Sequence, residues 1–329
     1  LFSVVTVPFA LAGLVLDGPA AAAGDAALRV AGTSIEILLW LIDRALSVPF
    51  AAASTSATGI IASLCVVSLS AWAVLPRAWP GRYIAVLAAL VLVSDRVEGP
   101  PAGCADVRML DVGQGLAVIV RTRQRTLLYD TGAAFRGGSD MASRVVLPYL
   151  AAQGIRRIDR LVVSHSDIDH AGGVPRILAG IEVGQVLAGE PGALAGVDAK
   201  ACRRGRSWRW DGVGFRVLHP PQEGGYADND ASCVMVVAAG DAHLLLTGDI
   251  ESGVERGLVE TGIAGPVQVI VVPHHGSKTS SSAAFVRTLS ADLALVSAGY
   301  RNRWDLPQPE VVRRWRDAGA AVLVTAQDG

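Results

Sequence analysis

The distribution of apolar and polar residues divides the chain into two parts. Up to about Val97 the apolar runs are long and charged residues are rare, whereas beyond Cys104 short apolar runs alternate with polar residues and turns. Proline and glycine cluster in the segment EGPPAGCAD between the two parts, as they do in linkers. The pattern therefore predicts two domains, residues 1–100 and residues 104–329.

The first part contains four apolar segments. LFSVVTVPFALAGLVL (residues 1–16) is almost long enough to span a bilayer, and ATGIIASLCVVSLSAWAVL (residues 57–75) has the full length. YIAVLAALVLVS (residues 83–94) reaches that length only if its flanking residues lie among the headgroups. In IEILLWLIDRALSVPF (residues 35–50) charges recur at helical spacing, which favours an amphipathic helix at the membrane interface. We therefore expect transmembrane and interfacial α-helices, rather than buried helices of a large soluble core.

The loop between the last two expected spans sets their orientation. Its sequence, PRAWPGR, carries Arg77 and Arg82 and no acidic residue. The excess of positive charge in cytoplasmic loops assigns this loop to the cytoplasm. The last span then carries everything after Asp95 to the extracytoplasmic side of the cell membrane.

The second part has the pattern of an α/β domain. The runs VRMLDV, LAVIVRT, TLLYDTG and LVVSH predict strands separated by turns, and DVGQG and DTGAAFRGG predict glycine-rich bends. No GK[ST] sequence follows these glycines, so they do not indicate a nucleotide-binding P-loop.

Composition and charge limit the possible location and binding partners of the chain. The chain is 51% hydrophobic, which is high for a soluble protein and agrees with a membrane part. A net charge of -1 gives no general attraction for nucleic acid, so any contact with DNA must come from local patches. One such patch contains Arg203, Arg204, Arg206 and Arg209, but almost every basic residue of the chain is arginine, which weakens that signal.

The chain begins at Leu1 without a methionine or a signal-peptide pattern, so we expect a fragment of a longer protein.

The histidines are the strongest chemical signal. All six lie in the second part, and four of them fall in the two clusters SHSDIDH and PHHGS. Between the clusters, the apolar run HLLLTGDI ends at Gly248 and Asp249. Imidazole and carboxylate are ligands for zinc, manganese and iron, and ligands at the ends of consecutive strands can converge on one edge of a sheet. The pattern predicts a metal site, and we interpret the isolated His219 and His243 as structural.

These motifs carry a family resemblance. SHSDIDHAGG, LLTGDI and VPHHGSKTSSS, preceded by LDVGQG and LLYDTG, resemble the metallo-β-lactamase superfamily. More narrowly, they resemble the extracytoplasmic domain of ComEC-type competence proteins, the channels for DNA uptake in natural transformation. The resemblance extends from about Cys104 to the end of the chain. It implies an αββα sandwich with metals at one edge, and it makes the preceding helices the last ones of the channel.

The resemblance also implies a set of metal ligands. His165 and Asp167 would hold the first metal, Asp169 and His170 the second, and Asp249 would bridge them. One histidine of the 274–275 pair would complete the second site.

The resemblance also implies roles for other residues of the motifs. Of the histidine pair, His274 is the favoured ligand, and His275 is assigned a role in phosphate binding or proton transfer. Asp130 and Asp111 match positions that orient ligand histidines. With one or two ions bound, Asp249, His275 and Lys278 would carry phosphodiester hydrolysis. Lys278 would meet a phosphate oxygen, although an ordinary solvated lysine remains the alternative.

The chain departs from the superfamily pattern at three places. Asp167 replaces the usual middle histidine, which makes the site richer in oxygen and favours Mn²⁺ over Zn²⁺. The segment YADNDASCV has no histidine where a third ligand motif is expected, which predicts a weak or empty first site. Leu306 and Gln308 stand where many relatives carry two histidines, so any catalytic part of those histidines is absent.

The cysteines bear on the compartment. An extracytoplasmic domain allows a disulfide, and we predict that Cys202 pairs with Cys233. Sequence alone leaves Cys104 as a competing partner, and Cys65 lies within an expected span.

Three functions remain open at this point. The first is a metal-dependent nuclease attached to a DNA-uptake channel, degrading the strand that does not enter. The second is a non-catalytic domain of the channel that guides DNA, and the third is an envelope phosphodiesterase or other hydrolase. The expected partners are DNA, the membrane, the rest of the channel protein and other components of the uptake machinery.

Overall fold

The computed structural model describes residues 5–16, 20–47, 68–69, 72, 99–223 and 225–328. The chain divides into two compact units, Leu1–Ser54 and Thr55–Gly329, and each is described by itself. The domain boundary expected near residues 100–104 stays a prediction.

The first unit is a pair of helices, α1 (Val7–Val15) and α2 (Ala21–Ser47). The two helices pack in an antiparallel arrangement. The hydroxyl oxygens of Thr6 and Ser34 lie 2.7 Å apart at one end of the pair, and Gly24 contacts Leu16 at the other end. A Cβ atom on Gly24 would collide with the Leu16 carbonyl oxygen, so glycine permits this close approach.

The expected membrane segments are only partly within the described residues. Helix α2 covers residues 35–47 of the segment expected to be amphipathic, and α1 is a nine-residue helix within the first expected span. The spans expected at residues 57–75 and 83–94 lie outside the described residues, apart from residues 68, 69 and 72. Among the helices that the structure describes, none combines the length and the apolar character that crossing a bilayer requires.

The second unit is built on two large sheets and a small one. The six-stranded sheet contains, in spatial order, β1 (Asp106–Met109), β2 (Val118–Arg121), β3 (Thr126–Tyr129), β5 (Arg160–Val163), β7 (Val186–Ala188) and β8 (Ala199–Ala201). The seven-stranded sheet contains β15 (Ala321–Val324), β14 (Leu293–Val296), β13 (Val269–Val271), β12 (Ala242–Leu246), β11 (Val234–Ala239), β10 (Val213–His219) and β9 (Ser207–Trp210). Strands β4 (Arg157–Ile158) and β6 (Glu182–Val183) form a short parallel pair.

Side chains that alternate along the strands create the layers. In β2, Val118 and Val120 join the core between the two large sheets, whereas Ile119 joins the core under the helices of the first sheet. In β12, Leu244 and Leu246 point into the same central core, whereas Leu245 packs under the helices of the second sheet. Because successive residues of a strand face opposite sides, runs that are apolar throughout can fill two cores at once.

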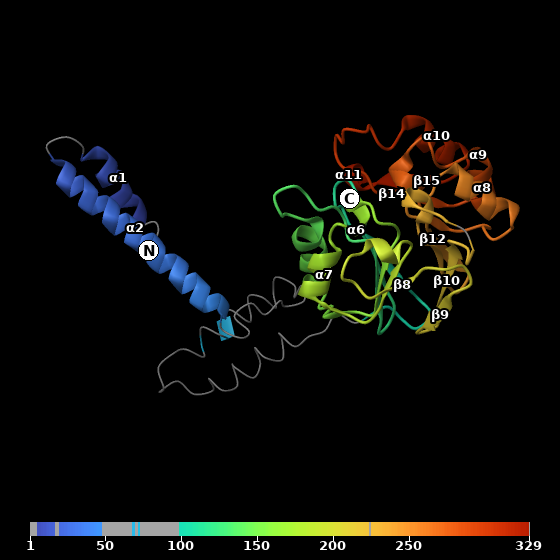
Figure 1. Ribbon diagram of the computed structural model, residues 1–329, viewed down its shortest axis with the longest axis horizontal. Helices are drawn as coiled ribbons and strands as arrows, with labels where there is room; N and C mark the ends of the chain where they lie inside the picture. Colours follow the sequence, from blue (N-terminus) through green and yellow to red (C-terminus); the bar gives the residue numbers. More distant parts are fainter. Residues whose placement is uncertain are drawn as a thin grey trace. The chain divides into compact units, whose positions relative to one another are not determined.

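Helices cover the outer faces of both sheets (Figure 1). One core lies between the first sheet and the segments η3 (Ala142–Val146), α5 (Leu147–Ala152) and α7 (Val174–Gly180). Another lies between the second sheet and α8 (Ser252–Glu260), α9 (Ala283–Leu289) and α10 (Pro309–Asp317). The remaining helical segments are short: α6 (Ile168–Ala171), η4 (Pro191–Ala193), η5 (Asp228–Ala231), η6 (Pro273–Gly276) and α11 (Thr325–Asp328). The expected αββα sandwich is confirmed.

Cys202 and Cys233 form the predicted disulfide, with a Cα–Cα distance of 5.7 Å. Both are fully buried in the central core, and the competing Cys104 is free and exposed. The bond joins the segment after β8 to the segment before β11, and so links the two large sheets.

Candidate metal centre

Polar residues from both sheets meet at the carboxyl ends of neighbouring strands. Strands β3 and β5 are parallel, as are β12 and β13. Asp130 directly follows β3, and His165 follows β5 after one residue; Asp249 and His275 follow β12 and β13. Because the carboxyl ends of parallel strands share one edge, these four side chains are brought to the same edge of the sandwich.

The side chains there form two overlapping groups. His165, His170 and Asp249 make one, and Asp169, His170 and His275 make the other, with the potential ligand atoms of each group within 4.8 Å of one another. The Nε2 atom of His170 lies 3.1 Å from Asp249 Oδ1 and 3.1 Å from His275 Nε2. The second oxygen of Asp249 lies 3.4 Å from His275 Nε2, so this carboxylate contacts histidines of both groups.

The opposite nitrogen of each histidine is held by another part of the chain. His170 Nδ1 lies 2.8 Å from Asp130 Oδ2, and His275 Nδ1 donates to the carbonyl oxygen of Ser297 at 2.8 Å. His165 Nδ1 lies 3.0 Å from Ser164 Oγ. Such contacts fix the ring orientation, and the Nε2 atoms of His170 and His275 lie 3.1 Å apart.

The backbone around Asp169 and His170 is also held in place. The carbonyl oxygen of Asp169 accepts a hydrogen bond from Leu116 N at 3.2 Å, and that of His170 accepts one from Thr131 Oγ1 at 2.8 Å. Gly115 has φ +131°, and a Cβ atom there would collide with the Asp169 carbonyl oxygen. The LDVGQG segment therefore needs glycine to pack against the ligand-bearing helix α6.

The two adjacent histidines lie in a tight turn that directs their side chains to different surroundings. His274 and His275 both have φ +53°, a left-handed conformation that is uncommon for residues other than glycine. The turn places buried His275 in the cluster, whereas His274 Nδ1 contacts Thr279 Oγ1 at 3.1 Å and lies 3.6 Å from Glu251. The sequence interpretation favoured His274 as the ligand, but the structure brings His275 to the other ligands.

The charges of the site favour a bound cation. Burial disfavours the charged form of His170, yet Asp249 and Asp130 outweigh it and raise its pKa well above the usual value. Burial also opposes the charge of His275, but Asp249 and Asp169 raise its pKa to about 9. Burial likewise opposes the charge of Asp249, but His170 and His275 hold its pKa well below the usual value. The negative carboxylates stabilise positive charge at the site, either as protons on His170 and His275 or as a metal ion, and the two compete.

The residues present fit a divalent metal. The Nε2 atom of His165 is buried without a hydrogen-bond partner in the described chain, and an unsatisfied buried polar atom costs about 1–3 kcal/mol. Three imidazole nitrogens and the carboxylates of Asp169 and Asp249 form a mixed nitrogen and oxygen donor set, which suits Zn²⁺, Mn²⁺ or Fe²⁺.

The other predicted residues lie at varying distances from this cluster. Asp167 is half-exposed, and its Oδ2 atom lies 3.6 Å from His165 Nε2. Lys278 is exposed and has no ion-pair partner among the described residues. Asp111 accepts a hydrogen bond from Gly113 N, which shapes a turn and does not orient a histidine. Asp130, in contrast, contacts His170 as expected.

Sequence reasoning missed three buried serines. Ser164 Oγ donates to Asp130 Oδ2 at 2.8 Å, Ser232 Oγ accepts from Asp249 N at 3.0 Å, and Ser297 supplies the carbonyl that holds His275. Ser232 belongs to the segment YADNDASCV, where the sequence lacks the expected histidine. A serine beside each strand end was the available signal, but serine is too common in turns for that signal to stand alone.

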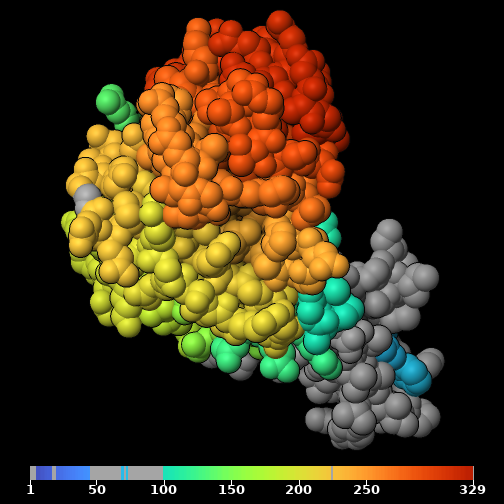
Figure 2. Space-filling model, turned by 90° about the vertical axis from the view of Figure 1, so that its right-hand side faces the viewer, coloured from blue at the N-terminus to red at the C-terminus, as the bar shows by residue number. Residues whose placement is uncertain are grey.

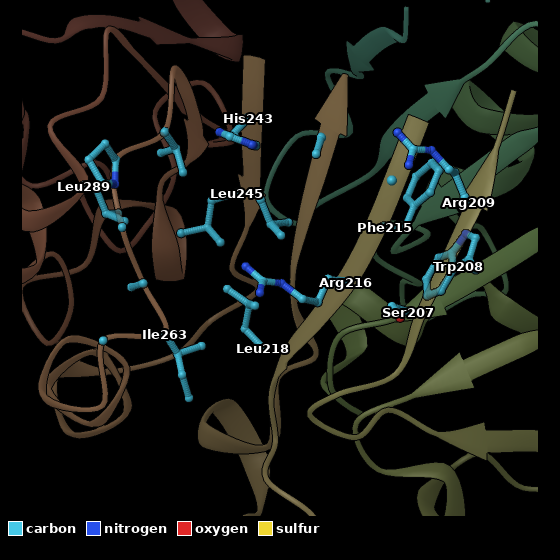
Figure 3. A pocket seen from close by; sticks show the side chains of 18 residues that line it. Ser207, Trp208, Arg209, Phe215, Arg216, Leu218, His243, Leu245, Ile263 and Leu289 are labelled. Atoms are coloured by element: carbon cyan, nitrogen blue, oxygen red, sulfur yellow. The ribbon is translucent and has the colours of Figure 1, made fainter. Parts of the chain in front are cut away.

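A groove lies away from this cluster, on the outer face of the second sheet. Figure 2 shows this side of the second unit, with the orange and red residues above the yellow ones. The groove has a volume of about 720 Å³ and shares no residue with the two metal-ligand groups. Arg216 and Leu218 of β10 and His243 and Leu245 of β12 line it (Figure 3). His243 thus lies in the wall of this groove, and His219 Nε2 contacts the carbonyl oxygen of Asp230 at 2.8 Å.

The arginine patch considered for DNA is largely engaged with the backbone. Arg203, Arg204 and Arg209 donate to the carbonyl oxygens of Cys202, Leu218 and Gly212. Their side chains therefore hold the backbone on both sides of β9 and within β10, which reduces their value as a docking surface.

Comparison with known proteins agrees with the fold and the motifs. Competence protein ComA of Neisseria gonorrhoeae is 39% identical over 329 residues, which cover 100% of this chain and 45% of that protein. Recombination protein 2 of Haemophilus influenzae is 39% identical over 223 residues, 68% of this chain and 28% of its own length. ComE operon protein 3 of Bacillus subtilis is 28% identical over 249 residues, 68% of this chain and 32% of its own length. The chain thus spans less than half the length of each of these relatives.

A family model provides the assignment. The model described as the metallo-beta-lactamase superfamily matches residues 110–300, which include all the residues of the two metal-ligand groups. The chain therefore belongs to the metallo-beta-lactamase superfamily, whose members are in general metal-dependent hydrolases.

Proposed function

We propose that this chain is the metal-dependent nuclease part of a membrane channel for DNA uptake. The observation that carries the proposal is the cluster around His170, which is shared by both candidate ligand groups. The similarity to competence proteins along the whole chain supports DNA as the substrate.

Five residues are the proposed ligands of one or two divalent ions. His165, His170 and Asp249 hold the first, and Asp169 and His275 complete the second, with His170 and Asp249 lying between them. Asp167 remains a further ligand of the first ion, reached by rotation of its half-exposed side chain. His275 takes the position that the sequence interpretation gave to His274.

Bound divalent ions would supply Lewis-acid stabilisation of the charge that develops on a phosphodiester and would make water a better nucleophile. The reaction adds a water oxygen to phosphorus and breaks one ester P–O bond, and the departing sugar oxygen gains a proton. Asp130 keeps the His170 ring oriented during this step. Lys278, exposed and three residues after His275, is placed to bind a phosphate oxygen.

The proposed location is the extracytoplasmic side of the cell membrane. The two arginines in the loop at residues 76–82 and the buried disulfide both favour this assignment. In α2, Leu39, Trp40 and Leu41 are consecutive and all at least 49% exposed, which is typical of a surface that contacts lipid or another part of a larger protein.

Substrate choice tests this proposal. The full 329-residue chain is incubated with Mn²⁺ and either end-labelled linear DNA or a small aromatic phosphodiester, each with and without a chelator. We expect chelator-sensitive cleavage of DNA at a higher kcat/KM than for the small ester. Cleavage of the small ester alone would indicate an envelope phosphodiesterase, and DNA binding without cleavage of either would indicate a domain that only guides DNA.

A further inference from the structure

The loop between β14 and α10 carries an unusual set of exposed side chains. Its sequence from residue 299 is GYRNRWDLPQ. Tyr300 is 72% exposed and Trp304 is 49% exposed, although large aromatic side chains are usually at least partly buried. Arg301 and Arg303 are also exposed, and each guanidinium lies over the ring beside it, at 5.2 Å from the Tyr300 centroid and 4.2 Å from the Trp304 centroid.

The side chain of Asn302 braces the backbone of the loop. The amide nitrogen of Asn302 donates to the carbonyl oxygens of Gly299 and Leu306, at 2.9 and 2.6 Å. Its amide oxygen accepts from the backbone N–H groups of Trp304 and Leu306, at 3.2 and 3.0 Å. The aromatic side chains are therefore exposed on a braced loop, which lowers the entropy lost when they bind a partner.

Both ends of the loop are attached to the metal centre. Ser297, the first residue after β14, accepts the hydrogen bond from His275 Nδ1 through its carbonyl oxygen. At the far end, Gln308 N donates to the carbonyl oxygen of Gly276 at 3.0 Å, and a Cβ atom on Gly276 would lie 2.6 Å from Pro307. Gly276 directly follows His275, so the loop begins and ends beside a proposed ligand.

The charge of the loop indicates which kind of molecule it binds. Neither Arg301 nor Arg303 has an ion-pair partner in the part of the chain that the structure describes, and Asp305 is the loop's one acidic residue. Exposed aromatic rings that alternate with guanidinium groups lacking an ion-pair partner match the alternating bases and phosphates of an unpaired nucleic acid strand. Double-stranded DNA keeps its bases stacked inside, where an aromatic side chain cannot reach their faces.

We propose that residues 300–304 form a binding platform for single-stranded DNA, on which Tyr300 and Trp304 stack against bases and Arg301 and Arg303 contact phosphates. The inference rests on the proposed nuclease function and names the form of DNA presented to that site. The sequence signal is the YRNRW segment, which lies directly before the position where the two expected histidines are replaced.

Binding without cleavage tests the platform. The full chain is kept in chelator, so that the strand is not cut, and is titrated with a fluorescent oligothymidylate and with a matched strand that lacks bases. We expect tighter binding of the strand with bases, and a loss of about 5- to 100-fold for Tyr300→Ala or Trp304→Ala, so that the double variant binds both strands alike. Trp304→Phe retains an aromatic face and should retain most of the affinity.

The salt dependence of binding tests the role of the two arginines. Arg301→Ala and Arg303→Ala should each lower the slope of log affinity against log salt by about 0.7, as expected for one lost contact to a single strand. Tyr226→Ala and Arg216→Ala are matched controls, because both residues are exposed and lie outside the loop. Thermal unfolding identifies variants that have lost the fold.

Two results would overturn the platform. One is equal binding of the two strands by the unmodified chain, and the other is binding of anionic lipid vesicles through this loop with no binding of single strands. Neither depends on cleavage. A chain that binds single strands through the loop but never cuts DNA would instead refute the proposed nuclease function.

Discussion

At the residue scale, the central result is the difference between two neighbouring histidines. Both sit in a left-handed turn, yet only His275 is buried against the other ligands, whereas His274 contacts Thr279 and approaches Glu251. The sequence identifies the histidine pair as a source of a metal ligand, but it does not show which of the two is the ligand. That depends on backbone angles that few non-glycine residues adopt.

Substitution of each histidine tests this assignment. We expect His275→Ala to abolish high-affinity binding of Mn²⁺, since a ligand is lost, whereas His274→Ala should keep binding within a few fold. Isothermal titration with both variants measures the difference. Equal loss in the two variants, or a greater loss for His274→Ala, would contradict the geometry.

The carboxylate and histidine of α6 should be essential to hydrolysis. We expect Asp169→Ala and His170→Ala each to abolish metal-dependent cleavage while leaving the fold intact, because each removes a proposed ligand of the ions that the reaction needs. Circular dichroism verifies the fold, and Asp241→Ala, an exposed carboxylate in the turn between β11 and β12, is the control. Wild-type activity in either folded variant would show that the site is assigned incorrectly.

At the element scale, strand ends and one disulfide determine where the ligands lie. Cys233 follows Ser232, whose hydroxyl accepts from Asp249 N, and the Cys233 amide donates to the Ser164 carbonyl at 2.9 Å. The Cys202–Cys233 bond therefore secures the segment beside His165 and Asp249.

Removal of this bond should weaken both stability and metal binding. A disulfide between residues 31 apart is expected to contribute about 3 kcal/mol to the free energy of unfolding. We expect Cys202→Ala with Cys233→Ala to lose about that much in denaturant melts and to bind Mn²⁺ more weakly, with Cys104→Ala as the control. Free thiols at both positions in protein isolated from its native membrane would argue against the bond.

Much of the second unit could be predicted at this scale. The apolar runs around LAVIVRT, TLLYDTG and LVVSH are the strands β2, β3 and β5, because runs of this kind fill cores on both sides of a sheet. Asp130 and Asp249 were identifiable because they end such runs. The roles of Ser232 and Ser297 depend on contacts between distant segments, which hydrophobic periodicity does not contain.

At the scale of the whole molecule, the donor set governs the choice of metal. In the sequence, Asp167 and the absence of a third-motif histidine both favour Mn²⁺. The structure places Ser232 beside His165 in that motif and keeps Asp167 half-exposed, so no further imidazole is present in the two ligand groups.

We therefore predict faster DNA hydrolysis with Mn²⁺ than with Zn²⁺ at matched occupancy. Zn²⁺ has the higher intrinsic affinity for such sites, so occupancy must be measured together with rate. Metal analysis of each loaded sample gives the occupancy. An equal or higher rate with Zn²⁺ would refute the argument from the oxygen ligands.

The proposed function requires metal-dependent cleavage of DNA by the cluster around His170. The most direct measurement is to strip the full chain of metal with a chelator, remove the chelator, and follow cleavage of end-labelled linear DNA as Mn²⁺ is added back. We predict no cleavage in the stripped protein and a rate that rises with Mn²⁺ and then saturates, with no recovery in His170→Ala. Cleavage that survives stripping, or recovery in His170→Ala equal to that of the unmodified chain, would contradict the account.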